Sequence, residues 1–261
     1  MPFLETNGVR YFQFASLASA PITQAIFTRR GGVSEGAYAE LNVGRTVGDE
    51  GSNVDENLKR SFAAVGKPRN SLFDSWLVHG TNALVAEAPR PPEWERPPQA
   101  DIVMTDKLGV SLFMRFADCV PMLFFDPIKK AIAIAHAGWR GTLLGVANSA
   151  VEGIAANYGS QPADLVVGIG PAISVEKYEV GPEVVGEVRK VFGSAAKELL
   201  PRNDGHYHFD LIGANRVMLE NSGVSRIELC NICTATDTED WFSHRASGGK
   251  TGRFGALIAL E

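Results

Sequence analysis

The chain has 261 residues, of which 45% are hydrophobic and 21% charged, so it has ample material for a globular core. Its net charge of −5 and its pI near 5.6 lack the basic excess that is typical of proteins binding nucleic acid or anionic membranes. The sequence has neither an apolar run long enough to span a membrane nor a secretory signal, and three cysteines are too few for a disulfide framework, so we expect a cytoplasmic protein.

The first part of the chain predicts loops, one helix and two strands. Segments 28–34 and 41–49 are rich in glycine and arginine without a clear period, which is typical of loops. Segment 53–65 begins with a capping residue and ends before a glycine, so it predicts a helix. Segments 75–79 and 110–116 are short and largely apolar, and they predict strands.

The middle of the chain predicts a β-hairpin. Two short apolar runs, 121–125 (PMLFF) and 131–135 (AIAIA), are separated by the turn-rich segment 126–130 (DPIKK). A turn between two such runs is typical of a hairpin. We expect Phe125 to pair with Ala131.

This register brings Cys119 and His136 to the open end of the hairpin. It places Val120 opposite His136 and Cys119 opposite Ala137, so the thiol and the imidazole are within one residue of direct opposition. Facing Cβ atoms in such a pair are roughly 4.5–5.5 Å apart. The two side chains could therefore bind one metal ion, or they could form a nucleophile–base pair.

The second half of the chain alternates helices and strands. Two segments, 142–158 and 184–192, carry apolar residues at helical spacing and predict helices, and 210–221 is expected to form a third helix. Three others predict strands: 164–169, 226–232 and 254–260. Hairpins interspersed with helices indicate the α/β class, with mixed β-sheets flanked by helices rather than a strict βαβ winding. No linker divides the chain, so we expect a single domain over residues 1–261.

His79 ends the predicted strand 75–79 and could complete a metal site. With Cys119 and His136 it would supply three ligands and leave a fourth tetrahedral position for water or substrate, as catalytic zinc sites do. Zinc would lower the pKa of water at that position to about 7. The spacings match no compact zinc-finger pattern, so a hydrogen-bonded histidine and a packed cysteine remain the alternatives.

Segment 136–142 (HAGWRGT) is a turn from a strand into a helix, and it predicts an anion site. A helix N-terminus offers unpaired N–H groups and a positive dipole end, and Arg140 adds a guanidinium. The alternative is that Thr142 only caps the helix and Arg140 is solvated. Asp118, beside Cys119, could orient a ligand or occupy a turn.

Several strings, taken together, resemble one known family: FTRRGGVSEGAYAELNVG, VHGTN, ADCVPMLFFDP, AIAHAGWRGT, GIGPAIS with YEVG, and WFSHR with TGR. They run from about Phe27 to the C-terminus, and ADCVP followed by HAGWRG is specific in combination. The chain resembles the multicopper polyphenol oxidoreductases (laccase-like), a family better described as bacterial purine nucleoside phosphorylases with adenosine deaminase activity. Some members are described as peptidoglycan editing factors. Many members read HQVHG where this chain has Trp76-Leu77-Val78-His79-Gly80, so Trp76 replaces a histidine.

The resemblance implies a fold similar to the catalytic domain of bacterial deamidating toxins and a metal held by His79, Cys119 and His136. We expect zinc as the cofactor, with copper as the alternative. The implied substrates are adenosine, inosine, guanosine and 5′-methylthioadenosine, which would undergo phosphorolysis, together with deamination of adenosine. Deamination needs a proton donor, for which Asp118 and Glu176 are candidates, so Asp118 joins Cys119 and His136 as a predicted catalytic residue.

Phosphate and substrate need cationic or polar groups. We expect Arg140 first, followed by Asn42, Arg45 and Arg245, with Arg253 as a further candidate. The predicted partners are small molecules, purine nucleosides and phosphate, with neither nucleic acid nor membrane, and the predicted state is a monomer.

Three other functions stay open at this point. A copper-dependent polyphenol oxidase could use the same three ligands with an axial Met122, although five histidines are too few for the additional trinuclear cluster. A cysteine hydrolase could use Cys119 as nucleophile and His136 as base, acting on a peptidoglycan precursor. A binding module without catalysis would have no need of an open three-ligand site.

Overall fold

Two six-stranded sheets form the centre of the computed structural model, which describes residues 3–91, 93 and 96–261. The first sheet has the order β1-β2-β3-β14-β7-β4, and its neighbours are antiparallel except for the parallel pair β4 and β7. Its strands are β1 (Phe3–Thr6), β2 (Val9–Phe12), β3 (Ile22–Phe27), β4 (Leu72–Asp74), β7 (Ser111–Phe116) and β14 (Phe254–Leu260).

The second sheet has the order β13-β10-β8-β9-β6-β5. It is antiparallel in the middle and parallel at both edges, where β13 pairs with β10 and β5 pairs with β6. Its strands are β5 (Ala83–Val85), β6 (Ile102–Thr105), β8 (Val120–Asp126), β9 (Ala131–Ala137), β10 (Val166–Ile169) and β13 (Arg226–Leu229). A small hairpin of β11 (Arg202–Asn203) and β12 (His206–Tyr207) lies apart from both sheets. The predicted mixed α/β class is confirmed.

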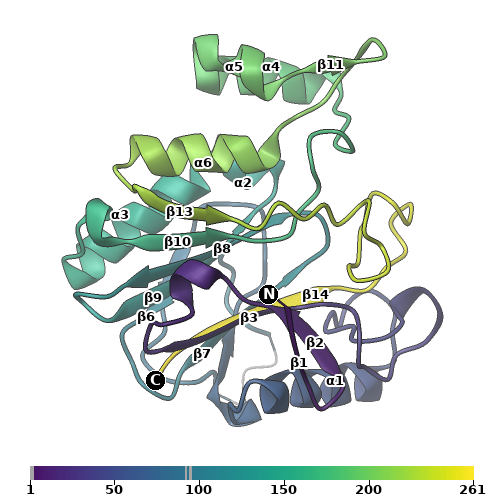
Figure 1. The fold of residues 1–261 in the computed structure, drawn as a ribbon, viewed down its shortest axis with the longest axis vertical. Helices are drawn as coiled ribbons and strands as arrows, with labels where there is room; N and C mark the ends of the chain where they lie inside the picture. The colour runs from purple at the N-terminus through teal and green to yellow at the C-terminus, as the bar shows by residue number, and fades with distance from the viewer. Residues whose placement is uncertain (1–2, 92, 94–95) are drawn as a thin grey trace.

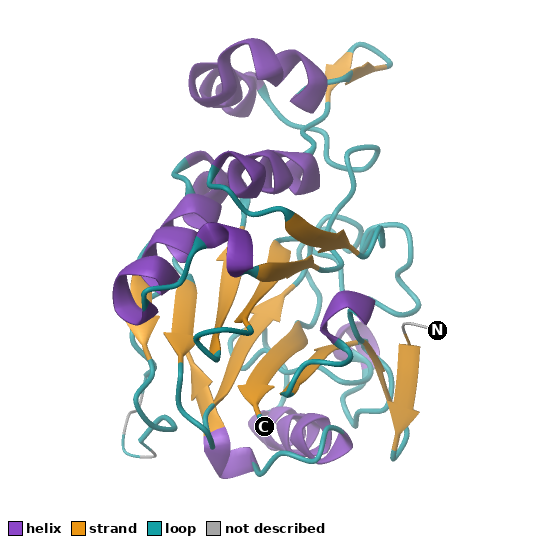
Figure 2. Ribbon diagram, turned by 60° about the vertical axis from the view of Figure 1, so that its left-hand side comes forward, coloured by secondary structure: helices purple, strands orange, loops and turns teal. Residues whose placement is uncertain are grey.

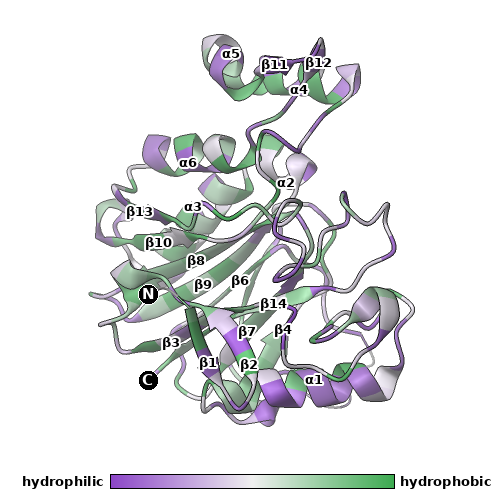
Figure 3. Ribbon diagram, turned by 45° about the vertical axis from the view of Figure 1, so that its right-hand side comes forward, coloured by the Kyte–Doolittle hydropathy of each residue, from purple (hydrophilic) through white to green (hydrophobic). Residues whose placement is uncertain are grey.

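The four inner strands of the second sheet, β6, β8, β9 and β10, are buried on both faces, because the sheet is covered on both sides. Along β8, Leu123 and Phe125 face the first sheet, where they pack in one core cluster with Phe116 and Phe254. The alternate residues, such as Phe124, pack in a second cluster with the helices. This two-sided burial explains the nearly continuous hydrophobic run, which Figure 3 shows along the central strands.

Helices cover the outer faces of the two sheets (Figures 1 and 2). Helix α1 (Gly51–Ala64) covers the first sheet through Val54, Leu58 and Phe62. The second sheet is covered by α2 (Trp139–Leu143), α3 (Val146–Tyr158) and α6 (Leu211–Asn221). Helices α4 (Pro182–Phe192) and α5 (Ala196–Leu199), with the β11–β12 hairpin, form the outermost part of the molecule at the top of Figure 1. None of the described helices is long and apolar enough to cross a membrane.

The predicted hairpin is confirmed, but its register is wrong by one residue. Phe125 pairs with Ile132 rather than with Ala131, and His136 faces Pro121 rather than Val120. The turn has four residues because the Asp126 carboxylate accepts hydrogen bonds from the backbone N–H groups of residues 128 and 129 and so closes a tighter loop than the pattern suggested. Since side chains alternate between faces, the observed register reverses the predicted orientation of one strand relative to the other.

Two further predictions need correction. The helix predicted over 142–158 is two helices, α2 and α3, because Gly145 has a left-handed backbone (φ 87°) that interrupts the first and starts the second. The strand predicted over 75–79 is wrong, because the strand of this region, β4, ends at Asp74. The chain then crosses from the first sheet to the second, where Trp76 forms an isolated bridge with Gln99 just before β6. The helices predicted over 53–65, 184–192 and 210–221 are confirmed within two residues at their ends.

Candidate metal centre

Three predicted metal ligands converge at one point between the two sheets. His79 lies on the crossing segment after β4, Cys119 lies just before β8, and His136 lies near the end of β9. Their ligand atoms are all within 4.8 Å of one another. The distance from Cys119 Sγ to His79 Nε2 is 3.9 Å, and the two imidazole rings have centroids 4.9 Å apart at 81°. A tetrahedral zinc ion needs N and S donors at this kind of spacing, since Zn–N is about 2.0–2.1 Å and Zn–S about 2.3 Å.

A buried carboxylate, Asp101, holds this arrangement in place. It accepts a 2.8 Å hydrogen bond from His136 Nδ1 and three more from the backbone N–H groups of Val78, His79 and Gly80, at 3.1, 3.0 and 2.7 Å. Burial raises the pKa of Asp101, but the hydrogen bonds from His136 and Gly80 outweigh it and lower that pKa below its usual value. An ionised carboxylate only accepts, so His136 carries a proton on Nδ1, and Nε2 is the nitrogen that a metal ion would use.

The backbone near the ligands is itself strained. His79 and Asp118 both have positive φ, 60° and 85°, although neither is glycine. The Asp101 carboxylate compensates at His79 by accepting hydrogen bonds from three consecutive N–H groups. Such strain costs about 1–3 kcal/mol per residue and persists where surrounding contacts fix the geometry.

Gly138 leaves the space that the ligands occupy. A Cβ atom at this position would lie 2.6 Å from His79 Cδ2 and 3.1 Å from Cys119 Sγ. Extending the hairpin register by one residue beyond the pair of Val120 and Ala137 places Cys119 opposite Gly138. A side chain there would displace both ligands, so the donor set and its surroundings fit a metal ion.

The thiol and the imidazole of the site perturb each other. Burial raises the pKa of Cys119, but the charge and hydrogen bond of His136 and the hydrogen bond of His79 lower it to about 6. Burial lowers the pKa of His136, whereas Cys119 and Asp101 raise it to about 9. Cys119 is therefore a thiolate at neutral pH, which is the form that binds a metal or acts as a nucleophile.

The ligands open into a large cleft of about 820 Å³. His79, Cys119 and His136 all line it, next to Trp76 and Tyr178. Among the described residues most of its charged lining is cationic, with two carboxylates, Asp74 and Asp118, against seven arginines: Arg45, Arg69, Arg90, Arg96, Arg115, Arg245 and Arg253. Anionic ligands are therefore favoured in this cleft.

A smaller cavity of about 210 Å³ adjoins the same ligands. His79 and Cys119 line it together with Trp139, Arg140 and Tyr178. The candidate metal centre thus lies where a small, partly aromatic cavity meets a large cationic cleft.

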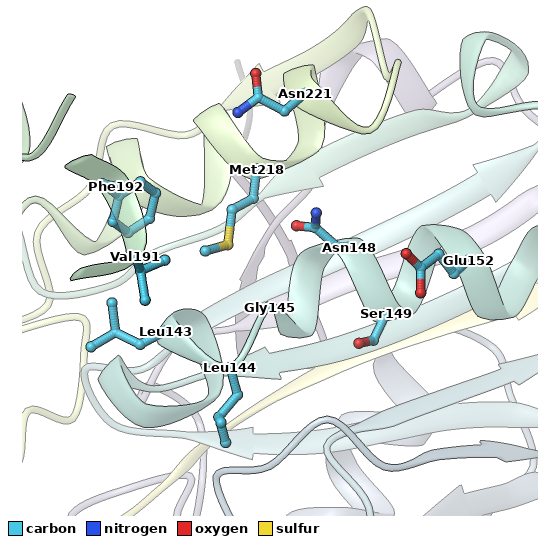
Figure 4. Close-up of a pocket in the computed structure, with 10 residues that line it drawn as sticks. All are labelled: Leu143, Leu144, Gly145, Asn148, Ser149, Glu152, Val191, Phe192, Met218 and Asn221. Carbon is cyan, nitrogen blue, oxygen red and sulfur yellow. The ribbon is translucent and has the colours of Figure 1, made fainter. Parts of the chain in front are cut away.

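Another cavity, of about 440 Å³, lies between α2, α3, α4 and α6 (Figure 4). None of the residues lining it is a histidine, cysteine, arginine or lysine, so it has no part in this site.

The model of one protein family, described as multi-copper polyphenol oxidoreductase laccase, matches residues 23–261. The chain belongs to this family. A purine nucleoside phosphorylase from Deinococcus radiodurans is 36% identical over 239 residues, which are 92% of this chain and 89% of the relative. Purine nucleoside phosphorylase YfiH from Escherichia coli is 35% identical over 235 residues, 89% of this chain and 91% of the relative. The crystal structure of YlmD from Geobacillus stearothermophilus matches with a TM-score of 0.92 at 30% identity, over 100% of this chain and 99% of that chain.

The laccase-family name refers to copper, whereas the three ligands here are one sulfur and two nitrogen donors that suit zinc as well as copper. Met122, the axial ligand that a blue-copper centre would use, is fully buried in the core cluster that faces the helices. It lines neither of the two cavities at the metal centre.

The other predicted site residues of this family member have different surroundings. Asp118 lines both cavities, and its carboxylate accepts hydrogen bonds from Thr234 Oγ1 and from the backbone N–H of Arg245, each at 2.7 Å. Arg245 lines the cleft, stacks on Tyr178 and donates to the carbonyl oxygen of Glu179. Arg140 lines the small cavity, with its guanidinium over the ring of the adjacent tryptophan.

Two of the predicted polar residues are engaged elsewhere, and a third lies outside these cavities. Arg45 lines the cleft but pairs with Asp55. Asn42 is fully buried, where its side chain accepts hydrogen bonds from the backbone N–H groups of Gly44 and Arg253. Glu176 lines a separate cavity of about 790 Å³.

Sequence patterns revealed neither Asp101 nor the arginines at positions 69, 90 and 115. An isolated acid in QADIV, directly before a strand of apolar residues, was the only sequence signal for Asp101.

Proposed function

We propose that this protein is a zinc-dependent purine nucleoside phosphorylase that also deaminates adenosine. The observation that carries the proposal is the convergence of His79, Cys119 and His136 at the junction of a small aromatic cavity and a large cationic cleft. The relatives named as purine nucleoside phosphorylases support the same reaction class. We propose adenosine, inosine, guanosine and 5′-methylthioadenosine as its substrates.

The two cavities match the two parts of a purine nucleoside reaction. Trp139 and Tyr178 offer aromatic faces in the small cavity, which suits stacking with a purine base. The guanidinium groups of the cleft suit phosphate, whose oxygens accept paired N–H donors. In phosphorolysis a bond forms between a phosphate oxygen and C1′ of the ribosyl group as the bond from C1′ to the base breaks, and the base leaves with a proton.

His79, Cys119 and His136 would hold the zinc ion, which as a Lewis acid activates water at neutral pH and so supplies the chemistry of deamination. Asp101 orients His136 for this role through its hydrogen bond to Nδ1. Asp118 accepts two hydrogen bonds as a carboxylate, so we assign it to positioning the backbone of Arg245 rather than to donating a proton. Burial raises the pKa of Tyr178, so this residue, which lines both cavities, keeps its hydroxyl proton and can donate a hydrogen bond to the substrate.

A second candidate function is supported by one observation. Cys119, His136 and Asp101 also form a nucleophile, a base and an orienting carboxylate, the arrangement of a cysteine hydrolase that needs no metal. Such an enzyme could act on a peptidoglycan precursor. The position of His79 against the same thiol favours the metal, because a cysteine hydrolase has no need of a second imidazole there.

The deciding experiment incubates zinc-loaded protein with adenosine or inosine, with and without phosphate, and separates the products by chromatography. Inosine from adenosine, and free base with ribose 1-phosphate only when phosphate is present, would support the proposal. Chelation should abolish both reactions, zinc should restore them, and Cys119→Ala should abolish them without rescue. Turnover that survives chelation would favour the cysteine hydrolase instead. A zinc-loaded enzyme that turns over no purine nucleoside would refute the proposal, and cell-wall precursors would then be tested.

A further inference from the structure

Three arginines cluster in the large cleft, and the carboxylates beside them are too few to neutralise their charge. Arg69, Arg90 and Arg115 line the cleft around the buried carboxylate of Asp74. We propose that these arginines form an anion subsite that binds a phosphate group. The subsite is separate from Arg140, which the sequence favoured as the phosphate ligand. The identity of the anion as phosphate rests on the proposed function, whereas the anion subsite itself rests on the geometry alone.

Two of the three guanidinium groups are held in fixed positions. Asp74 ends β4, with only 2% of its side chain exposed, and lies beside β7, which carries Arg115. Arg90 Nη1 lies 2.8 Å from Asp74 Oδ1, and Arg115 Nη1 lies 2.8 Å from Asp74 Oδ2. Arg115 also donates from Nε to the carbonyl oxygen of Val43 at 2.8 Å. These contacts use a minority of the donors of each guanidinium, which has five, so the remaining N–H groups are available on side chains that line the cleft.

The third guanidinium lacks a carboxylate of its own. Among the residues that the structure describes, none forms an ion pair with Arg69. It lies over the ring of Phe62, in partial burial. Burial lowers the pKa of Arg69, and the neighbouring charges of Arg115 and Arg90 lower it further, against the effects of Asp74 and Asp55. An anion at this position would relieve both the desolvation and the mutual repulsion.

The charge of the cluster indicates the class of ligand. Three guanidinium groups and the Asp74 carboxylate leave a net charge of +2, since the nearby Asp55 is already paired with Arg45, in a chain whose overall net charge is −5. A phosphate group carries about −1.5 to −2 at neutral pH and presents several acceptor oxygens, so it balances the cluster better than a single carboxylate would. Two sources have this chemistry, namely inorganic phosphate used as a co-substrate and a phosphate group carried on the nucleoside ligand.

The experiment measures binding rather than turnover. Isothermal titration calorimetry would give the dissociation constants of inorganic phosphate, adenosine and adenosine 5′-monophosphate for zinc-loaded protein and its variants. We expect Arg69→Gln to weaken phosphate binding about 10-fold or more, since hydrogen bonds to charged groups have this order of strength. We expect Asp74→Asn to tighten phosphate binding, because it removes the anion that competes for the same guanidinium groups. An increase in affinity is a result that a purely structural role for the cluster would not produce.

Two controls make the result decisive. Arg216→Gln removes an exposed arginine of α6 that pairs with Glu220 outside the cleft, and it should bind phosphate as the unmodified protein does. Arg140→Gln tests the alternative phosphate ligand in the small cavity. Unchanged phosphate binding in Arg69→Gln, or a loss confined to Arg140→Gln, would overturn the proposal. If Asp74→Asn fails to fold, Arg69→Gln decides alone, because it breaks no ion pair that the described residues make.

The three titrated molecules, inorganic phosphate, adenosine and adenosine 5′-monophosphate, distinguish the two sources of phosphate. If inorganic phosphate and adenosine bind together without competition, the subsite takes the free co-substrate. If adenosine 5′-monophosphate displaces phosphate, and Arg69→Gln weakens its binding but not that of adenosine, the subsite takes a phosphate carried by the ligand. Either result supports the subsite. Since neither depends on catalysis, a protein that binds phosphate here but turns over no nucleoside would refute the proposed function and leave this inference standing.

Discussion

Asp101 and His136 are joined twice, through a 2.8 Å hydrogen bond from the imidazole Nδ1 to the carboxylate and through a 2.8 Å bond from the backbone N–H of His136 to the carbonyl oxygen of Asp101. The same carboxylate accepts hydrogen bonds from the segment that carries His79. One buried acid therefore positions two of the three candidate metal ligands. Such outer contacts fix both the tautomer and the orientation of a ligating histidine.

Replacing this acid should weaken the metal site more than the fold. We expect Asp101→Asn to lower zinc affinity about 10- to 100-fold, because the amide cannot match the carboxylate as an acceptor for four N–H groups. Titration against a competing chelator would measure the change. Asp204→Asn, in an exposed turn with φ 49° where asparagine is well tolerated, is the matched control. Equal zinc affinity in the two variants would contradict the role assigned to Asp101.

Gly138 provides a second test of the site. We expect Gly138→Ala to abolish stoichiometric zinc binding, since the new Cβ would meet His79 Cδ2 at 2.6 Å and Cys119 Sγ at 3.1 Å. Overpacking of this kind also costs about 1–3 kcal/mol of stability. Metal analysis after dialysis and thermal unfolding would measure both effects.

The control for that substitution is Gly186→Ala, within α4. A Cβ at Gly186 would meet no heavy atom within 4 Å. Because alanine is the better helix former, this variant should bind zinc normally and gain about 0.5–1 kcal/mol of stability. Normal zinc binding by Gly138→Ala would show that the ligands can move apart and would contradict the rigid site described above.

The reactivity of Cys119 should depend on pH in a defined direction. Its pKa is lowered to about 6, so in metal-free protein the thiolate fraction rises as pH increases through about 6 and is nearly complete at neutral pH. We expect the rate of alkylation by iodoacetamide, followed by peptide mass spectrometry, to rise through the same range. His136→Asn should move this inflection toward the ordinary thiol value of about 8.5.

Two internal controls accompany the alkylation. Burial raises the pKa of Cys230 to about 12, so this thiol should stay unmodified under the same conditions. Added zinc should protect Cys119. An inflection near 8.5 in the unmodified protein, or full reactivity in the presence of zinc, would argue against a shared thiolate–metal site.

Glu228, on the edge strand of the second sheet, binds the backbone near the start of the chain. The stability that these hydrogen bonds contribute should depend on pH. Its carboxylate accepts hydrogen bonds from the backbone N–H groups of Ala15 and Ser16, at 3.1 and 2.7 Å. Burial raises the pKa of Glu228, but the hydrogen bonds from Ser16 and Ala15 outweigh it and lower that pKa in the folded state. The stabilisation is therefore present above the unfolded pKa and is lost as pH falls through the lower folded value.

We expect Glu228→Gln to lower the free energy of unfolding by about 1 kcal/mol at pH 7, as loss of a helix-capping acceptor does. The difference between the variant and the parent protein should shrink at acidic pH. Urea denaturation at both pH values would measure it, with the exposed Glu152→Gln as the control. A difference that stays constant down to strongly acidic pH would exclude the carboxylate as its origin.

Local patterns predicted the elements whose signals lie within one segment. Apolar periodicity located α4, and the hairpin of β8 and β9 followed from two apolar runs around a turn. The register was missed because it depends on the hydrogen bonds of one side chain, Asp126, within the turn. Similarly, the break at Gly145 depends on a backbone conformation that periodicity does not report.

Residue types predicted the candidate metal ligands. The residues whose role depends on contacts between distant segments were missed. His79 and His136 stood out as strand-end histidines, whereas Asp101 is distinguished only by the N–H groups that the fold brings around it. Of the arginines around Asp74, Arg69 precedes β4, Arg90 follows β5 and Arg115 lies on β7, so no sequence window contains them together. Charge summed over the whole chain, at −5, hides a cleft of the opposite sign.

The position of β14 has a consequence for biosynthesis. Residues 254–260 form an interior strand of the first sheet, between β3 and β7, and the backbone of Arg253, in the cleft, is bound by Asn42. A ribosome must therefore release these residues before the first sheet can close. Until then β3 and β7 each have one unpaired edge, which is the kind of strand edge that favours aggregation.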